Sequence, residues 1–184
     1  MKKFPIPMIL SLVLVTLSCH GVQIIYDVDK TADFGQFHTY NFKIPRDNPE
    51  APIAFNEINQ NFLKGAISNE MVQKNYKISD DPNLMISFYL KVEDRMEIYD
   101  YGPYYGYDRG WTDHKTYYYK IGTLTIDLVD TNRNRLVWQG SAIGVLPKTN
   151  KNAEEKINLV VNRIFSKYPY LAGESKPVAK EKRK

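Results

Sequence analysis

The feature that most constrains the fold is an unbroken alternation of apolar and other side chains over residues 84–93. Every second position is apolar: Leu84, Ile86, Phe88, Leu90 and Val92. Successive side chains of a β-strand point to opposite faces, so this pattern predicts a strand with one face in a core. A similar alternation over residues 123–128 is separated from another over 136–142 by a short polar stretch. These two segments are predicted to form an antiparallel hairpin.

Two other segments repeat their apolar side chains with the period of a helix. The first spans residues 53–75, and its predicted core-facing stripe comprises Ala54, Ile58, Phe62, Ala66, Met71 and Val72. Asn75 is suited to the left-handed conformation that ends a helix. The second spans residues 153–168, with Asn152 as a candidate cap.

Shorter strand patterns near residues 22–26 and 38–42 complete the order strand, strand, helix, strand, strand, strand, helix. This order predicts an α+β fold, with a mainly antiparallel sheet of about five strands and two amphipathic helices packed on one face. The single cysteine of the 184-residue chain excludes an intramolecular disulfide. We expect one domain over residues 19–173.

The formal net charge of +4 belongs to the two ends of the chain. Lys2 and Lys3 contribute two positive charges and the tail over residues 174–184 a surplus of three, which leaves residues 19–173 at −1. A basic face for nucleic acid therefore lacks support, and no nucleic-acid partner is expected. The lysine-rich tail is predicted to be disordered, either as a solubilising segment or in contact with an anionic surface.

Residues 1–18 have the layout of a secretory signal, with two lysines, a short apolar run and small or polar residues before Cys19. The sequence Thr16-Leu17-Ser18-Cys19 resembles the lipobox of bacterial lipoproteins, in which the cysteine receives acyl chains such as palmitate. The alternative is ordinary cleavage and an inert thiol. His20 and Gly21 follow Cys19, and the aspartate that retains lipoproteins in the inner membrane of some enteric bacteria is absent. The expected location is therefore the outer membrane, facing the periplasm.

Several segments resemble one family, the bacterial envelope lipoproteins grouped as domain of unknown function 4136. They are Ala32-Asp33-Phe34, His38-Thr39-Tyr40, Asp81-Pro82-Asn83-Leu84-Met85, the strand from Gly122 to Asp130, and the segment from Leu136 to Ala142. The resemblance covers roughly residues 26–169. It implies a lipid-anchored α+β domain and supplies no reaction and no catalytic residues.

No familiar catalytic motif occurs, and the three histidines are dispersed along the chain. Asp108, Asp113 and His114 are suited to bind a metal from one loop, or form a solvated loop tip. Glu93 and Glu97 are the carboxylates that a glycoside hydrolase would need, or two surface acids. We predict no catalytic residue, no metal and no cofactor.

The unusual segment is residues 99–119, which hold eight of the 14 tyrosines. The candidate contact residues in this Tyr- and Gly-rich loop are Tyr101, Tyr104, Tyr105, Tyr107 and Trp111. Such rings suit stacking on a sugar or peptide. They also suit the lipid headgroup zone, and a hairpin extension without a ligand has the same composition.

Two functions follow as hypotheses. The first is a non-enzymatic envelope lipoprotein that binds or scaffolds an envelope protein or glycan, with the Tyr-rich loop as its contact. The alternative is a hydrolase acting on cell-wall or surface polysaccharide.

Overall fold

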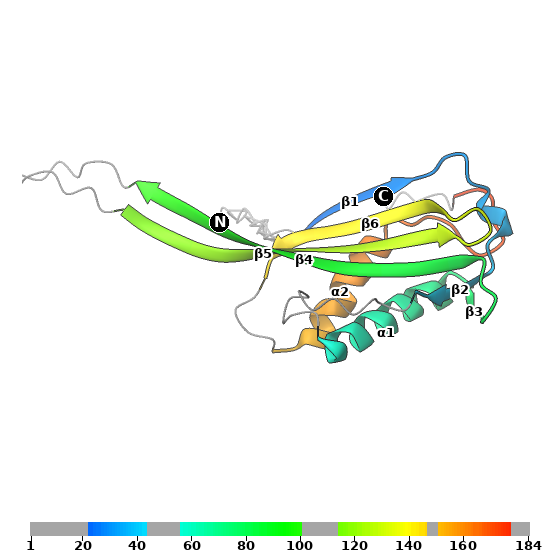
Figure 1. Cartoon of the computed structure of the whole chain (residues 1–184), viewed down its shortest axis with the longest axis horizontal. Coiled ribbons are helices and arrows are strands. Elements are labelled where there is room, and N and C mark those ends of the chain that lie inside the picture. Colours follow the sequence, from blue (N-terminus) through cyan, green and yellow to red (C-terminus); the bar gives the residue numbers. More distant parts are fainter. Residues whose placement is uncertain (1–21, 44–55, 101–113, 147–150, 178–184) are drawn as a thin grey trace, which may run out of the picture.

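The computed structural model describes residues 22–43, 56–100, 114–146 and 151–177, which form a six-stranded sheet and two α-helices (Figure 1). The strands are β1 (Gln23–Val28), β2 (Thr39–Phe42), β3 (Lys77–Ile78), β4 (Leu84–Asp100), β5 (His114–Asp130) and β6 (Arg135–Val145). The helices are α1 (Glu57–Gln73), α2 (Ala153–Phe165) and the short 3-10 helix η1 (Phe34–Gln36). Both α-helices lie on the same face of the sheet.

The strand order is β1-β6-β5-β4-β2-β3. The pairs β1–β6, β6–β5 and β5–β4 are antiparallel, whereas β2 runs parallel to both β4 and β3. The predicted α+β fold and the β5–β6 hairpin are confirmed, but the sheet has one strand more than expected and a parallel edge. The connection from β2 to β3 contains α1, and a helical crossover is what allows neighbouring strands to run parallel.

The buried face of α1 comprises Asn59, Leu63, Ala66, Ile67 and Met71. The predicted stripe was wrong at Ile58 and Val72, which are 63% and 62% exposed, and its first member, Ala54, lies outside the described residues. Apolar residues occur on two sides of this helix, so the period alone does not decide which side packs. Asn56 caps the start of the helix, where its Oδ1 accepts a hydrogen bond from the Asn59 backbone N–H at 2.9 Å. It ends before Asn75, which has the predicted left-handed conformation with φ of 66°.

Asn152 lies at the cap position predicted for α2 but does not make the capping hydrogen bond. Asn152 precedes the helix with φ of 57°, and its side chain makes no capping hydrogen bond. Instead Asn152 Nδ2 donates to Glu155 Oε2 at 3.3 Å. A left-handed residue turns the side chain away from the backbone N–H groups of the first turn, which an extended cap residue such as Asn56 reaches.

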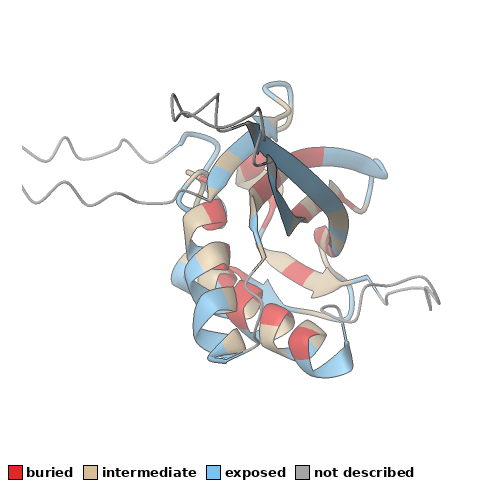
Figure 2. Ribbon diagram, turned by 90° about the vertical axis from the view of Figure 1, so that its left-hand side faces the viewer, coloured by how far each residue is buried: buried red, intermediate tan, exposed pale blue. Residues whose placement is uncertain are grey.

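The core lies between the sheet and the helices, where the buried residues of Figure 2 gather. The indole of Trp138 on β6 packs against Phe165 at the end of α2 and Tyr168 beyond it, with ring centroids 5.6 and 5.2 Å apart. Gly140 lies beneath this contact, and a Cβ there would collide with Trp138 and Ile164. Glycine therefore sets the close approach of α2 to β6.

A pair of buried tyrosines joins the segment after α1 to the segment after α2. The hydroxyl groups of Tyr76 and Tyr168 are hydrogen bonded at 2.7 Å. Burial raises the pKa of Tyr76 to about 12, and burial also raises the pKa of Tyr168 well above its ordinary value. Both side chains are therefore neutral at physiological pH, and each hydroxyl satisfies the other.

The described chain continues past Gly173. Ser175 Oγ donates a hydrogen bond to Asp33 Oδ1 at 2.7 Å, which ties this segment to the start of η1. The predicted signal over residues 1–18 and residues 178–184 of the predicted tail lie outside the described residues.

Candidate functional site

β4 and β5 are each 17 residues long and extend beyond the ends of the strands next to them. On one side β2 ends at Phe42, opposite Ile86, and on the other β6 ends at Val145, opposite Ile121. Residues 95–100 of β4 and 114–119 of β5 therefore pair with each other and with no other described strand. We call these two segments the arm. Figure 1 shows the arm projecting from the body of the domain, with no helix across it.

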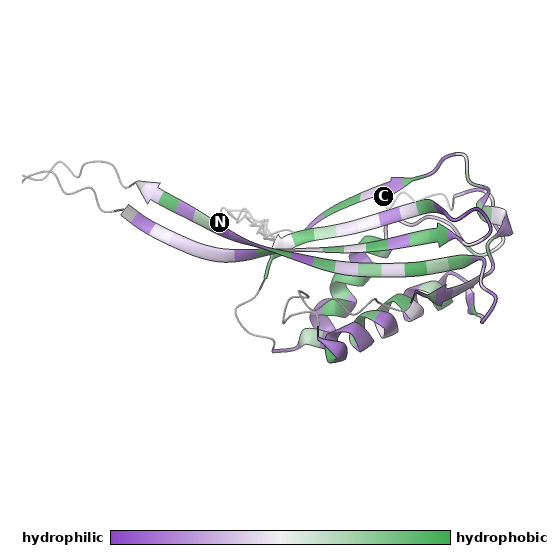
Figure 3. Ribbon diagram, in the orientation of Figure 1, coloured by the Kyte–Doolittle hydropathy of each residue, from purple (hydrophilic) through white to green (hydrophobic). Residues whose placement is uncertain are grey.

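The register of the arm separates its side chains into two faces. Met96 on β4 pairs directly with Tyr118 on β5, and Ile98 is the next side chain on the same face. We call Met96, Ile98 and Tyr118 the apolar face of the arm. They are 56%, 57% and 73% exposed. Figure 3 shows the corresponding hydrophobic bands on the distal half of β4.

The opposite face of the arm holds a polar network around Glu97. Tyr119 Oη donates to Glu97 Oε1 at 2.5 Å, and Tyr99 Oη donates to Glu97 Oε2 at 2.8 Å. The ring of Tyr99 lies edge-on to that of Tyr117, with centroids 5.5 Å apart. The two hydrogen bonds, with that from Tyr119 the stronger influence, hold the pKa of Glu97 below its ordinary value. Glu97 is therefore an ionised acceptor.

Glu93 lies at the base of the arm on the same face and is also held as a carboxylate. Lys91 Nζ lies 2.7 Å from Glu93 Oε1, and Arg95 donates to Glu93 Oε2 at 2.8 Å. These cations, Lys91 foremost, lower the pKa of Glu93. A glycosidase needs one carboxyl whose pKa is raised, so that it can donate a proton. Glu93 and Glu97 both shift in the opposite direction.

Asp127 is a carboxyl group whose pKa is raised, in contrast to those of Glu93 and Glu97. It lies on β5 within the body of the sheet, where burial raises its pKa. Gln139 Nε2 on β6 donates to Asp127 Oδ1 at 2.8 Å, which partly offsets that shift. This hydrogen bond between the Gln139 amide and the Asp127 carboxyl joins the neighbouring strands β6 and β5.

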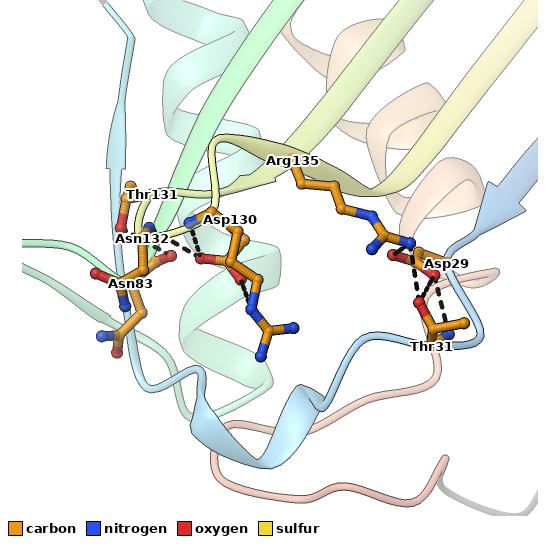
Figure 4. Close-up of polar contacts among 8 residues, drawn as sticks. Asp29, Thr31, Asn83, Asp130, Thr131, Asn132 and Arg135 are labelled. Atoms are coloured by element: carbon orange, nitrogen blue, oxygen red, sulfur yellow. Dashed lines mark hydrogen bonds and ion pairs between the residues drawn. The ribbon is translucent and has the colours of Figure 1, made fainter.

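A second polar cluster ties the turns at the end of the sheet away from the arm (Figure 4). Arg135 lies 2.6 Å from Asp29 Oδ2 and donates to Thr31 Oγ1 at 2.9 Å. The buried carboxylate of Asp130 accepts from the backbone N–H groups of Asn132 and Arg133 at 2.9 and 3.2 Å. Each of these contacts closes a turn or joins two turns, so the cluster is explained by stability.

The attachment and contact residues predicted from the sequence are not among those described. Cys19, Tyr101, Tyr104, Tyr105, Tyr107 and Trp111 lie outside the described residues. Of the alternative metal ligands, Asp108 and Asp113 also lie outside, and His114 is described in its backbone alone. Within the described ranges, no three side chains of His, Cys, Asp or Glu gather closely enough to hold a metal ion.

The boundaries predicted for the Tyr-rich loop were too wide. Tyr99 and Asp100 are the last residues of β4, and residues 114–119 are the first of β5. Tyrosine suits strands, where its ring packs against a cross-strand neighbour as Tyr99 does against Tyr117. Sequence reasoning also missed Met96 and Ile98. A signal was present, because both resume the apolar spacing of two residues after Asp94 interrupts it.

None of the helices in the part of the chain that the structure describes is long and apolar enough to cross a membrane.

Comparison with known proteins gives one family and a small set of similar structures. The family model described as Domain of unknown function (DUF4136) matches residues 24–170. No curated protein sequence matches the chain. The crystal structure of a PDZ domain protein from Parabacteroides distasonis is similar with a TM-score of 0.56 and 16% identity, over 84% of this chain and 37% of that one. This likeness shows the fold alone.

The dodecameric protein PelC from Paraburkholderia phytofirmans matches with a TM-score of 0.48 and 10% identity, over 82% of this chain and 98% of that one. The chain thus spans little more than a third of the length of the PDZ domain protein and nearly all of PelC.

Proposed function

The chain belongs to the family described as Domain of unknown function (DUF4136), and on that premise we propose that it is a lipid-anchored binding or scaffold module of the bacterial cell envelope. The proposed attachment point is Cys19, the one cysteine of the sequence, which follows a segment with the layout of a secretory signal. The proposed location is the outer membrane, facing the periplasm.

The observation that carries a contact role is the arm. The arm is a two-stranded ribbon that pairs with no other described strand. Ordering its backbone costs conformational entropy that no added core offsets, so such a ribbon is marginally stable unless a partner binds it. Its exposed side chains include Met96, Ile98, Tyr99, Tyr117 and Tyr118. Exposed aromatic and aliphatic groups such as these, which lie on both faces of the arm, are typical of an interaction surface.

The polar network of the arm supports a binding role over hydrolysis. The pKa values of Glu93 and Glu97 are both lowered by their neighbours. Two carboxylates that stay ionised do not divide the roles of proton donor and base that glycoside cleavage requires. Glu97 instead fixes the rings of Tyr99 and Tyr119, and Glu93 pairs with Lys91 and Arg95.

The anchor is tested by the change Cys19→Ala. Without the thiol no acyl chain can be attached, so the variant is expected to move from the membrane fraction to the soluble fraction of the envelope. The measurement is flotation of isolated envelopes followed by the mass of the protein. A Cys19→Ala chain that has lost residues 1–18 and still floats with the membrane contradicts the anchor.

The contact role is tested by shortening the arm. Because Glu93 and Ile121 pair directly, the residues between them can be replaced by an Asn-Gly turn that closes a two-residue hairpin. Crosslinking in intact envelopes is expected to yield fewer adducts with this chain than with the natural one. A matched control exchanges Asn132, exposed in the turn at the opposite end, for Ser. An unchanged set of adducts in the shortened chain would sink the contact role.

A further inference from the structure

We propose that the apolar face of the arm, Met96, Ile98 and Tyr118, rests on the lipid surface of the membrane that holds the chain. This inference depends on the proposed anchor at Cys19 and names the component that the arm contacts. Three observations carry it: the position of the first strand relative to the arm, the length of chain available to the anchor, and the chemistry of the two faces.

The first strand begins at the same end of the sheet as the arm. Gln23 on β1 pairs with Ile143 on β6, Ile143 pairs with Thr123 on β5, and Thr123 pairs with Lys91 on β4. The start of β1 is therefore level with Lys91, four residues before the arm. Cys19 precedes Gln23 by four residues, which span at most about 14 Å when fully extended.

The distance of at most about 14 Å between Cys19 and Gln23 places the anchor near the arm. It also limits how the sheet can be oriented relative to the bilayer. Arg135, at the far end of β6, is eight residues from Ile143, or about 26 Å at the rise of a strand. Asp100, at the end of the arm, is nine residues from Lys91, or about 30 Å. Either end of the sheet, pointed at the bilayer, would extend past the anchored residue. This reach favours strands that run along the bilayer, with the arm beside its surface.

The chemistry of the arm suits the interface and not the hydrocarbon layer. The apolar face offers a thioether, a branched aliphatic chain and a tyrosine ring, all more than half exposed. Tyrosine is favoured where an apolar body and a polar tip meet lipid headgroups. The opposite face carries ionised Glu97, and the ribbon has two edges that no described strand pairs. The charge on that face and the unpaired backbone groups along both edges require water or headgroups around them.

The charges of the arm decide which lipid it needs. Arg95 and Lys115 are balanced by Glu97 and Asp100, so the arm is neutral overall. Attraction to anionic lipid depends on a surplus of basic residues, which the arm does not have. The contact is therefore expected on neutral phosphatidylcholine and to be insensitive to salt.

The experiment uses the anchored, full-length mature chain in phosphatidylcholine vesicles that carry a lipid-attached fluorescence quencher. The thiol of Cys19 is consumed by the anchor, so a cysteine introduced elsewhere is the one site for a fluorescent label. Tyr118→Cys places the label on the apolar face, Tyr117→Cys on the opposite face of the same strand, and Asn132→Cys at the far end of the sheet. The label at 118 is expected to lose most of its fluorescence, and those at 117 and 132 little.

The outcomes separate this inference from the proposed anchor. Protein that does not float with the vesicles shows that the anchor has failed, whatever the label reports. Floating protein whose label at 118 is quenched no more than that at 132 overturns the membrane contact. A label at 118 that is shielded from water in whole envelopes but not quenched by lipid assigns the face to a protein partner and also overturns it. Ile98→Cys repeats the measurement should Tyr118→Cys disturb the arm, and circular dichroism verifies the fold of each variant.

Discussion

At the scale of single residues, Tyr76 and Tyr168 show how a polar atom is accommodated in the core. Each ring is buried, and each hydroxyl has the other as its partner. A buried hydroxyl without a partner costs roughly 1–3 kcal/mol, so the two side chains depend on one another. The sequence marks both as aromatic, but 92 positions separate them and nothing in their local pattern pairs them.

The shifted pKa values of this pair predict a loss of stability at alkaline pH. In the unfolded chain both tyrosines titrate near pH 10, whereas burial raises the pKa of Tyr76 to about 12 in the folded domain. The pair's contribution is therefore complete below pH 10 and is lost as the pH rises toward 12. For Tyr76 alone the loss is about 3 kcal/mol at most. Urea unfolding at several pH values between 9 and 11.5 measures it.

The control for this prediction is the double change Tyr76→Phe and Tyr168→Phe, which removes both titrating groups together. Its unfolding free energy is expected to fall less steeply over the same pH range, since other tyrosines and lysines alone remain to titrate. Equal slopes in the natural and double-variant chains would show that the pair is not protonated preferentially in the folded domain.

At the scale of elements, β4 and β5 each serve two purposes. Their proximal halves supply core residues such as Leu84, Ile86 and Leu128, which are fully buried. Their distal halves, in the arm, bury none of their described side chains. The same alternation of side chains runs through both halves, so the pattern alone does not reveal where the core ends. That point is fixed by where β2 and β6 end.

The division of the hairpin predicts that the arm can be removed without unfolding the body. The chain in which Glu93 and Ile121 are joined by Asn-Gly is expected to keep its unfolding free energy within about 1 kcal/mol, because the lost side chains are exposed. Thermal and urea unfolding provide the measurement. A contrasting variant, Gly140→Ala, forces a Cβ against Trp138 and should be destabilised by roughly 1–3 kcal/mol. A shortened chain less stable than Gly140→Ala would contradict this division.

At the scale of the whole molecule, the topology determines which surfaces share one end. Among the described strands β1 is the first and pairs with β6, the last, so the segment that follows the proposed anchor enters the sheet beside the base of the arm. The polar cluster of Asp29, Asp130 and Arg135 closes the other end. The molecule thus has one end held by short turns and one that projects.

The helices add a further asymmetry, because both pack on one face of the sheet. α1 and α2 contact each other, and Asn162 Nδ2 of α2 donates to Glu70 Oε1 of α1 at 2.8 Å. The packing of α2 against Trp138 and the crossover through α1 leave the parallel strands β2 and β3 at the edge. A layered α+β domain results, with its arm along the strand direction.

The sequence by itself determined the elements that rest on local pattern. The alternation at residues 84–93, the β5–β6 hairpin, the two helical stretches and the left-handed Asn75 all follow from neighbouring residues, whose chemistry acts over a few positions. Tertiary structure alone decided the buried side of α1, the two-residue strand β3, the Tyr76–Tyr168 bond and the length of the arm. Each of these depends on whether a segment distant in the sequence lies alongside in the fold. The local pattern of residues does not state which distant segments become neighbours.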